Sequence, residues 1–162
     1  MPIVAADIQF LLTGGPANTD PNLSLGGAVS TTQIGSAINN LWDDVSSAES
    51  LAGDVEYRAI SVKNNHSNLS LFNAVIYLAE TTAPGSTVAI AVDSAGTQTV
   101  ADESTSPTGV TFSTPITKAT GISLGTIGPL THRRIWARRT ITADAASFSA
   151  DTGSFNVAGD TA

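Results

Sequence analysis

The side chains that most often perform catalysis are few in this chain and lie far apart in its sequence. His66 and His132 are the two histidines, and histidine is the side chain whose charge ordinarily changes near neutral pH. His66 lies in a run of Asn and Ser residues that is typical of a turn, and His132 begins a segment that we expect to be a strand. Neither has a carboxylate at the spacing of a catalytic motif. We therefore interpret both as surface residues.

The sequence also lacks the common motifs for nucleophiles and for phosphate binding. The chain has no cysteine, which excludes thiol nucleophiles, disulfides and thiolate metal sites. No Gly-x-Ser-x-Gly turn follows a predicted strand. Gly14-Gly15 and Gly26-Gly27 precede no helix with the pattern of a phosphate-binding or dinucleotide-binding loop. We expect no enzymatic activity and no cofactor.

Carboxylates occur as close pairs in the sequence, namely Asp43 with Asp44, Asp54 with Glu56, and Asp102 with Glu103. Loop carboxylates and carbonyls can hold calcium, and Asp44 and Asp54 flank one short segment. The chain lacks an Asp-x-Asp-x-Asp-Gly loop, however, and nothing indicates the fixed separation of two carboxylates that glycoside cleavage requires. We expect no metal site, with a calcium-binding loop between Asp44 and Asp54 as the open alternative.

Arginine and tryptophan are the residue types that most suggest contact with another molecule, because both are enriched in interface hot spots. Four of the seven Lys and Arg residues lie on one predicted strand and form what we call the arginine stripe, namely Arg133, Arg134, Arg138 and Arg139. The stripe suits an acidic neighbour, including another copy of the chain; a solvated strand face is the alternative. Trp42 completes the candidate interface, with burial beneath its own loop as the alternative. Trp136 is interpreted as a core residue.

Strands must position these residues, because apolar and polar residues alternate through much of the sequence. In residues 86–93, for example, Val88, Ile90 and Val92 fall on one face of an extended chain. Clusters of Gly, Pro, Asn and Ser separate such segments and are typical of turns. The pattern predicts strands over residues 8–12, 55–63, 73–79, 86–93, 97–101, 109–113, 121–126, 131–142 and 153–158.

Residues 13–53 lack this alternation and contain strong breakers of regular structure. Apolar residues over 32–42 have a helix-like spacing, but Gly35 and two Asn residues oppose a helix there. Residues 46–51 can form one short helical turn. A stretch of this length without regular structure is uncommon inside a compact domain and is usually functional or extended. We interpret residues 13–53 as a loop-rich arm or insertion that lies on a neighbouring subunit.

The segments together predict an all-β fold. No helix-length periodic segment interrupts the later strands, which argues against a parallel α/β architecture. The 162 residues suit one domain. We therefore expect a single domain over residues 1–162, an antiparallel β-sandwich of the immunoglobulin-like or jelly-roll kind, with residues 13–53 as its long irregular N-terminal loop or arm.

The charge balance excludes some classes of partner. A net charge of −7 argues against nucleic-acid binding, because phosphate contacts need clustered Lys and Arg. Charged residues make up 13% of the chain, about half the usual ~25%, which suits a surface that packs against other subunits. No basic-then-apolar leader is recognisable, and no apolar run approaches the ~20 residues of a membrane span. We expect neither a nucleic-acid nor a membrane partner.

Several segments resemble those of small structural proteins from tailed bacteriophage particles. They are residues 4–10, 25–27 and 53–58 in the first half of the chain, and 124–129, 134–140 and 159–161 in the second. The likeness covers most of the chain and is one of overall pattern, without a diagnostic ligand motif. It implies a β-sandwich that decorates or cements the capsid, or one that lies in the tail or its baseplate.

The resemblance and the absence of catalytic motifs lead to one functional expectation. We expect a non-enzymatic virion structural protein, a capsid decoration or cement protein that binds and stabilises the assembled head. It would be made in the host bacterial cytoplasm and reside in the virion, with the major capsid protein or other virion proteins as partners and with a homo-oligomer, a trimer in particular, as its own state. A tail, neck or baseplate component on the same scaffold is the first alternative. A carbohydrate-binding or adhesin-like module is the second.

Overall fold

The computed structural model describes residues 1–37, 39–80, 85–146 and 153–161. Strands dominate these residues, and regular helix is limited to α1 and three short 3-10 turns. The strands are β1 (Ile8–Thr13), β2 (Val29–Gln33), β3 (Asp54–Asn64), β4 (Leu71–Glu80), β5 (Ser86–Asp93), β6 (Ile122–Ile127), β7 (His132–Ile141) and β8 (Gly153–Thr161). The helical elements are η1 (Ala5–Asp7), η2 (Pro21–Leu23), α1 (Ser47–Ala52) and η3 (Lys118–Thr120).

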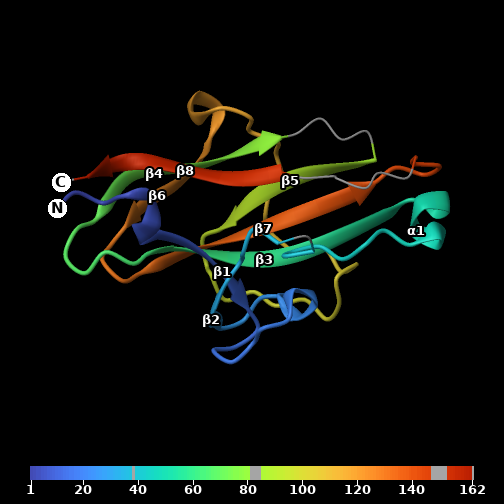
Figure 1. The fold of residues 1–162 in the computed structure, drawn as a ribbon, viewed down its shortest axis with the longest axis horizontal. Helices are drawn as coiled ribbons and strands as arrows, with labels where there is room; N and C mark the ends of the chain where they lie inside the picture. The colour runs from blue at the N-terminus through green and yellow to red at the C-terminus, as the bar shows by residue number, and fades with distance from the viewer. Residues whose placement is uncertain (38, 81–84, 147–152, 162) are drawn as a thin grey trace.

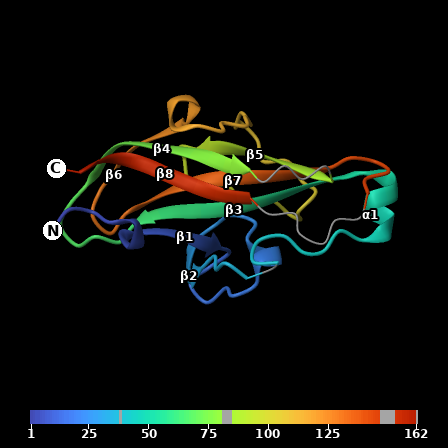
Figure 2. The same cartoon turned by 45° about the horizontal axis from the view of Figure 1, so that its top comes forward.

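The strands form two antiparallel sheets that pack face to face. The larger sheet has five strands in the order β2-β1-β3-β7-β5, and the smaller has three in the order β6-β4-β8. Figures 1 and 2 show the smaller sheet lying over the larger one, with both chain termini at one end of the long axis and α1 at the other. The predicted all-β antiparallel sandwich is therefore confirmed.

The main core lies between the two sheets. Ile60 and Val62 of β3, Ile135 of β7 and Ile76 of β4 are fully buried there. Phe10 of β1 and Phe155 of β8 meet with their ring centroids 5.9 Å apart, which places β8 above the β1 side of the larger sheet. Burial of this apolar surface is the main driving force for joining the sheets.

A second, smaller cluster covers the opposite face of the larger sheet. Tyr57 and Ala59 of β3 and Trp136 of β7 are buried there, and Val100 and Phe112 pack over them. Trp136 is 0% exposed, so its predicted core position is confirmed. Because loops cover this face, the centre of the larger sheet is buried on both sides.

Two predicted strands are wrong, because the segments concerned are loops that cover the outer face of the larger sheet. Residues 97–101 and 109–113 form no named strand and contribute only the isolated bridges Gly26–Thr99 and Ile90–Ser113. Their apolar residues resemble those of a strand because they pack on the sheet, yet they join no extended ladder. Strand β2 lies within a segment where the sequence predicted none.

The helix-like spacing over residues 32–42 does not correspond to a helix in the described part of that segment, whereas the short helical turn predicted near 46–51 is confirmed as α1. Ser46 caps α1 by accepting a hydrogen bond from the Glu49 amide, and the Glu49 carboxylate accepts one from the Ser46 amide. This reciprocal capping box stabilises the first turn. Gly53 ends the helix with φ 76°, a conformation that favours glycine.

Part of the loop-rich segment over residues 13–53 is anchored on the chain's own sheet through Thr13 and Ser24. Its contact with a neighbouring subunit stays a prediction. The Ser24 hydroxyl donates to the Ala59 carbonyl at 2.7 Å and accepts from the Thr13 amide at 2.9 Å. Thr13 and Ser24 are both fully buried. Since β1 leaves part of β3 unpaired, the loop supplies the hydrogen bonds that a neighbouring strand would otherwise make.

Candidate functional site: an arginine–carboxylate network at the α1 end

Strand geometry divides the arginine stripe between the two faces of the larger sheet. Successive side chains on β7 point to opposite faces, so Arg133 and Arg139 share one face and Arg134 and Arg138 share the other. Arg134 is 2% exposed and Arg139 is 6% exposed. The stripe is therefore divided between two faces of the sheet, and Arg134 and Arg139 are buried within the chain. Its role as a contact for an acidic neighbour stays a prediction.

Arg133 is the exposed member of the stripe, and it links the two sheets. Its Nη2 donates to the Thr126 carbonyl at 2.7 Å, and its Nε donates to the Leu124 carbonyl at 3.2 Å. Both acceptors belong to β6, one of the two outer strands of the smaller sheet. Arg133 thus occupies backbone acceptors at a sheet edge.

Arg134 and Arg138 hold loops against the outer face of the larger sheet. Arg134 donates from Nη2 to the Gly27 carbonyl at 2.7 Å and from Nε to the Ser61 hydroxyl at 3.3 Å. Burial lowers the pKa of Arg134 from its usual value, and the nearby Asp93 opposes this effect. The Arg138 guanidinium lies 5.0 Å from the centre of the Phe112 ring. Both arginines therefore contact loops of the same chain, and these contacts hold the loops on the sheet.

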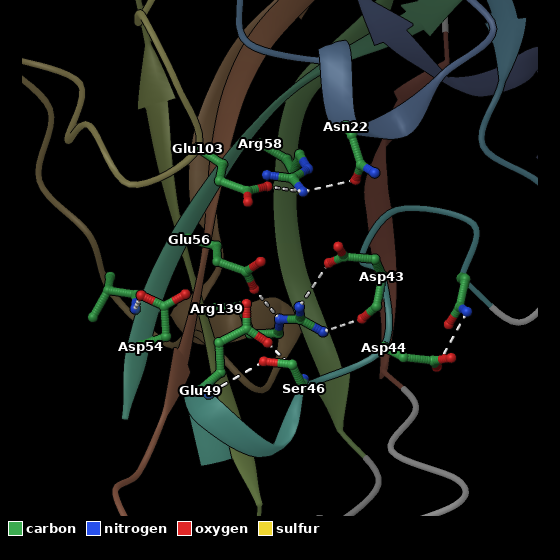
Figure 3. A network of polar contacts seen from close by, with 12 residues as sticks. Asn22, Asp43, Asp44, Ser46, Glu49, Asp54, Glu56, Arg58, Glu103 and Arg139 are labelled. Carbon is green, nitrogen blue, oxygen red and sulfur yellow. Dashed lines mark hydrogen bonds and ion pairs between the residues drawn. The ribbon is translucent and has the colours of Figure 1, made fainter. Parts of the chain in front are cut away.

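Arg139 lies at the centre of a polar network near α1 (Figure 3). Its Nε donates to the Glu56 carboxylate on the neighbouring strand β3. Its Nη1 donates to the Asp43 carbonyl at 2.8 Å, and its Nη2 lies 3.2 Å from the Asp43 carboxylate. One side chain thus joins both central strands to the loop that precedes α1.

Arg58 extends this network to two further loops. It is 0% exposed, and its Nη2 donates to the Glu103 carboxylate and, at 2.9 Å, to the Asn22 side chain. Arg58 was not among the site residues expected from the sequence. The available signal was the pair Glu56 and Arg58, two charged residues at strand spacing in a segment whose next residues, Ala59 and Ile60, are apolar, since buried charges are found paired.

Trp42 lies against both of these arginines. Its ring centre is 5.3 Å from the guanidinium carbon of Arg58 and 5.2 Å from that of Arg139. A guanidinium at this distance from an indole is attracted by the electrons of the ring. Trp42 is half-buried and also packs on the main core. Trp42 thus packs on its own sheet, beside Arg58 and Arg139. A contact with another subunit stays a prediction.

Acidic side chains surround the Arg139 end of the network. Oxygen atoms of Glu49, Asp54 and Glu56 lie within 4.8 Å of one another. Burial raises the pKa of Glu56 above its usual value, while the hydrogen bond and positive charge of Arg139 oppose this rise. The hydrogen bonds from Ser46 lower the pKa of Glu49. In this group, the environment of Glu56 therefore disfavours ionisation of its carboxyl, and the environment of Glu49 favours it.

The two histidines lie apart from this network. The Nδ1 atom of His66 accepts hydrogen bonds from the amides of Asn68 and Leu69, at 3.1 and 3.0 Å, which fits the turn that the sequence predicts. His132 lies with Lys63 beside a surface depression of about 360 Å³ between β1, β2 and the start of β7. Burial lowers the pKa of His132, and the positive charges of Arg134, Arg133 and Lys63 lower it further.

Comparison with known proteins returned no match to a family model, to a curated protein or to a solved structure. Among the described residues, no helix combines the length and apolar character that crossing a bilayer requires.

Proposed function

We propose that this chain is a non-enzymatic structural protein of a bacteriophage virion, and specifically a capsid decoration or cement protein that binds the assembled head. The resemblance of its sequence to small virion proteins motivates the class. One structural observation carries the proposal further: strand β8 offers a long, unprotected edge for association with another chain.

Strand β8 has nine residues and pairs with β4 along one side. Within the described residues, no backbone hydrogen bond reaches its other side. The strand contains neither Lys nor Pro, the residues that proteins use to protect an exposed edge. Such an edge can add a strand from another chain through main-chain hydrogen bonds.

Within the described residues, each of the other three edge strands has at least one backbone group bonded by a loop or by an arginine side chain. Ser113 exchanges two backbone hydrogen bonds with Ile90 of β5, at 2.8 and 2.9 Å. Arg133 covers β6 as described above, and the Pro16 carbonyl accepts a hydrogen bond from the Thr31 amide of β2 at 3.2 Å. The difference between these edges supports β8 as the site of assembly.

The outward face beside this edge is uncharged along its centre. Outward positions on the three strands of the smaller sheet alternate with buried ones, and they are Val75, Tyr77, Ala79, Ser123, Ser154, Asn156 and Ala158. Interface cores are depleted in charged residues and enriched in Tyr. This face and the β8 edge together form a surface suited to a shell of major capsid proteins or to further copies of the chain, with a trimer as the expected oligomer.

The mechanism of stabilisation would be mass action. A protein that binds the assembled shell and not its separated subunits shifts the equilibrium toward the shell. This activity needs no catalytic group, and it requires many copies distributed over the head.

The stoichiometry of virions encoded by the genome that carries this chain tests the proposal. We expect quantitative gel analysis to find a copy number that matches the capsomers of the head, and electron microscopy with a labelled chain to place it on the head surface. Light scattering of the purified protein should give three times the chain mass. A copy number of only a few per particle would favour the tail, neck or baseplate instead, and absence from purified virions would overturn the proposal.

A further inference from the structure

Three carboxylates from two adjacent elements converge at the α1 end of the sandwich (Figure 3). Asp54 and Glu56 lie two residues apart on β3 and therefore point to the same face. Glu49 reaches them from the first turn of α1, where its capping interaction with Ser46 fixes the side chain. Gly53 makes the sharp connection between the helix and the strand.

Glu56 provides an independent sign that this cluster binds a ligand. The residue is 0% exposed, and within the described part of the chain one of its two carboxylate oxygens has a partner, the Nε atom of Arg139. The other oxygen, Oε1, is buried and has no hydrogen-bond partner among the described residues. A buried carboxylate oxygen without a partner is costly, and the nearby carboxylates of Glu49 and Asp54 can supply no hydrogen to it when ionised.

The charges of the cluster also favour a cation. Glu49, Asp54 and Glu56 bring three negative charges together, and Asp43 adds a fourth on the far side of Arg139. Arg139 is the cation in direct contact with Glu56, and it shares its charge with Asp43. Since like charges at this separation repel one another, a multivalent cation would lower the energy of the group.

We propose that Glu49, Asp54 and Glu56 form a Ca²⁺ site that joins α1 to the end of β3. The donors are all carboxylate oxygens, which hard cations prefer. Oxygen ligands on opposite sides of a Ca²⁺ ion, at about 2.4 Å each, are separated by about 4.8 Å, and the three oxygens lie within 4.8 Å of one another. Backbone carbonyls or water complete the coordination. The proposal does not rest on the function in the virion proposed above.

Calcium titration of the full chain tests this site. The protein is first treated with a chelator and dialysed, and CaCl₂ or MgCl₂ is then added in a calorimeter and in a thermal-unfolding assay. The informative variants are Asp54→Asn and Glu49→Gln, because the amides keep the shape of the side chains and remove a ligand charge. Asp102→Asn is the matched control, since Asp102 is an exposed loop carboxylate that also accepts local hydrogen bonds, from Ser104 and Thr105.

We expect Ca²⁺ to bind the unmodified chain in the micromolar to millimolar range and to raise its unfolding temperature. Asp54→Asn and Glu49→Gln should each weaken Ca²⁺ binding by about tenfold or more, and Asp102→Asn should leave it unchanged. Circular dichroism should show that all variants are folded without calcium. The proposal is overturned if about 10 mM Ca²⁺ produces neither heat nor a shift in unfolding temperature, if Mg²⁺ acts equally well, or if Asp102→Asn weakens binding as much as Asp54→Asn.

Discussion

Arg139 is the residue on which the α1 end of the molecule most depends. It is the one described hydrogen-bond partner of the buried Glu56 carboxylate, and it also holds the Asp43 loop and one side of Trp42. Removing one partner of a buried ion pair is far more costly than the pair itself is stabilising, because the remaining charge is left without compensation. The contribution of Arg139 is therefore best measured by deleting it.

Arg139→Met should destabilise the protein by about 3 to 5 kcal/mol at neutral pH. Arg133→Met is the matched control, because Arg133 lies on the same strand and face but is exposed, and it should cost about 1 kcal/mol or less. Urea unfolding monitored by circular dichroism gives both values. Equal losses in the two variants would contradict the role assigned to the Glu56 contact.

The pH dependence of this loss has a definite sign. Burial raises the pKa of Glu56, and Arg139 opposes the rise, so Arg139→Met should raise that pKa further. A carboxyl with a raised pKa contributes stability that is fully present below its ordinary value of 4.5 and lost as the pH rises through its folded-state value. The deficit of Arg139→Met should therefore be smallest in acid and grow toward neutral pH. Unfolding measured at a series of pH values checks this.

His132 should give the opposite pH dependence. Its pKa is lowered from 6.5 by burial and by three neighbouring cations. A histidine with a lowered pKa contributes stability above the ordinary value, and this stability is lost as the pH falls through the folded-state value. His132→Gln should therefore flatten the decline in stability below pH 6.5. An NMR titration that places the pKa of His132 at or above 6.5 would contradict the explanation.

At the scale of elements, loops make direct hydrogen bonds to the strands of the larger sheet. Residues 22–27 form hydrogen bonds with β1 and β3. Residues 98–103 in turn form backbone hydrogen bonds with residues 22–27. Gly26 forms the closest approach, with φ 101° and a backbone bridge to Thr99. A Cβ atom at this position would lie 2.0 Å from the Gln98 carbonyl oxygen.

Gly26→Ala should therefore force these two loops apart. Gly15→Ala is the matched control, because Gly15 also has a positive φ, of 112°, but nothing lies within 4 Å of an added Cβ. The control should cost about 1 kcal/mol from backbone strain, and Gly26→Ala should cost at least about 2 kcal/mol more because atoms overlap. Urea unfolding of both variants measures the difference. Similar costs would show that the loop contact is not tight.

For the whole molecule, the β8 edge is the proposed site of association with another chain, because it pairs with β4 along one side only within the described residues. Phe155 and Val157 point into the core, so Asn156 and Ala158 point outward on the same strand. Positive charges at such outward positions are a common means of preventing edge-to-edge association.

The double variant Asn156→Lys, Ala158→Lys should lose association with the head and with other copies of the chain while its unfolding midpoint changes little. Thr87→Lys on the exposed side of edge strand β5 is the control and should retain association. Co-sedimentation with particles and light scattering of the free protein provide the two readings. Association that survives in the double variant would exclude β8 as the contact.

Much of the framework could be predicted from local sequence alone. Strands β3, β5 and β7 carry alternating side chains between turn-forming residues, and local alternation is sufficient to specify an extended segment and its two faces. The α1 turn was predictable for the same reason, since its capping residues lie within one short stretch.

The tertiary structure decided which faces are covered and which charges meet. Residues 97–101 and 109–113 have the composition of strands, and only their place above Trp136 shows that they are covering loops. Arg58 meets Asn22 and Glu103, and Arg139 meets Asp43 and Glu56, across long stretches of sequence. Alternation specifies that a side chain points to one side of a strand, but it carries no information about which distant segment lies there. Pairing and burial are properties of the packed chain. Packing separates the four arginines of the stripe onto two sheet faces, and it brings the carboxylates of Glu49, Asp54 and Glu56 together.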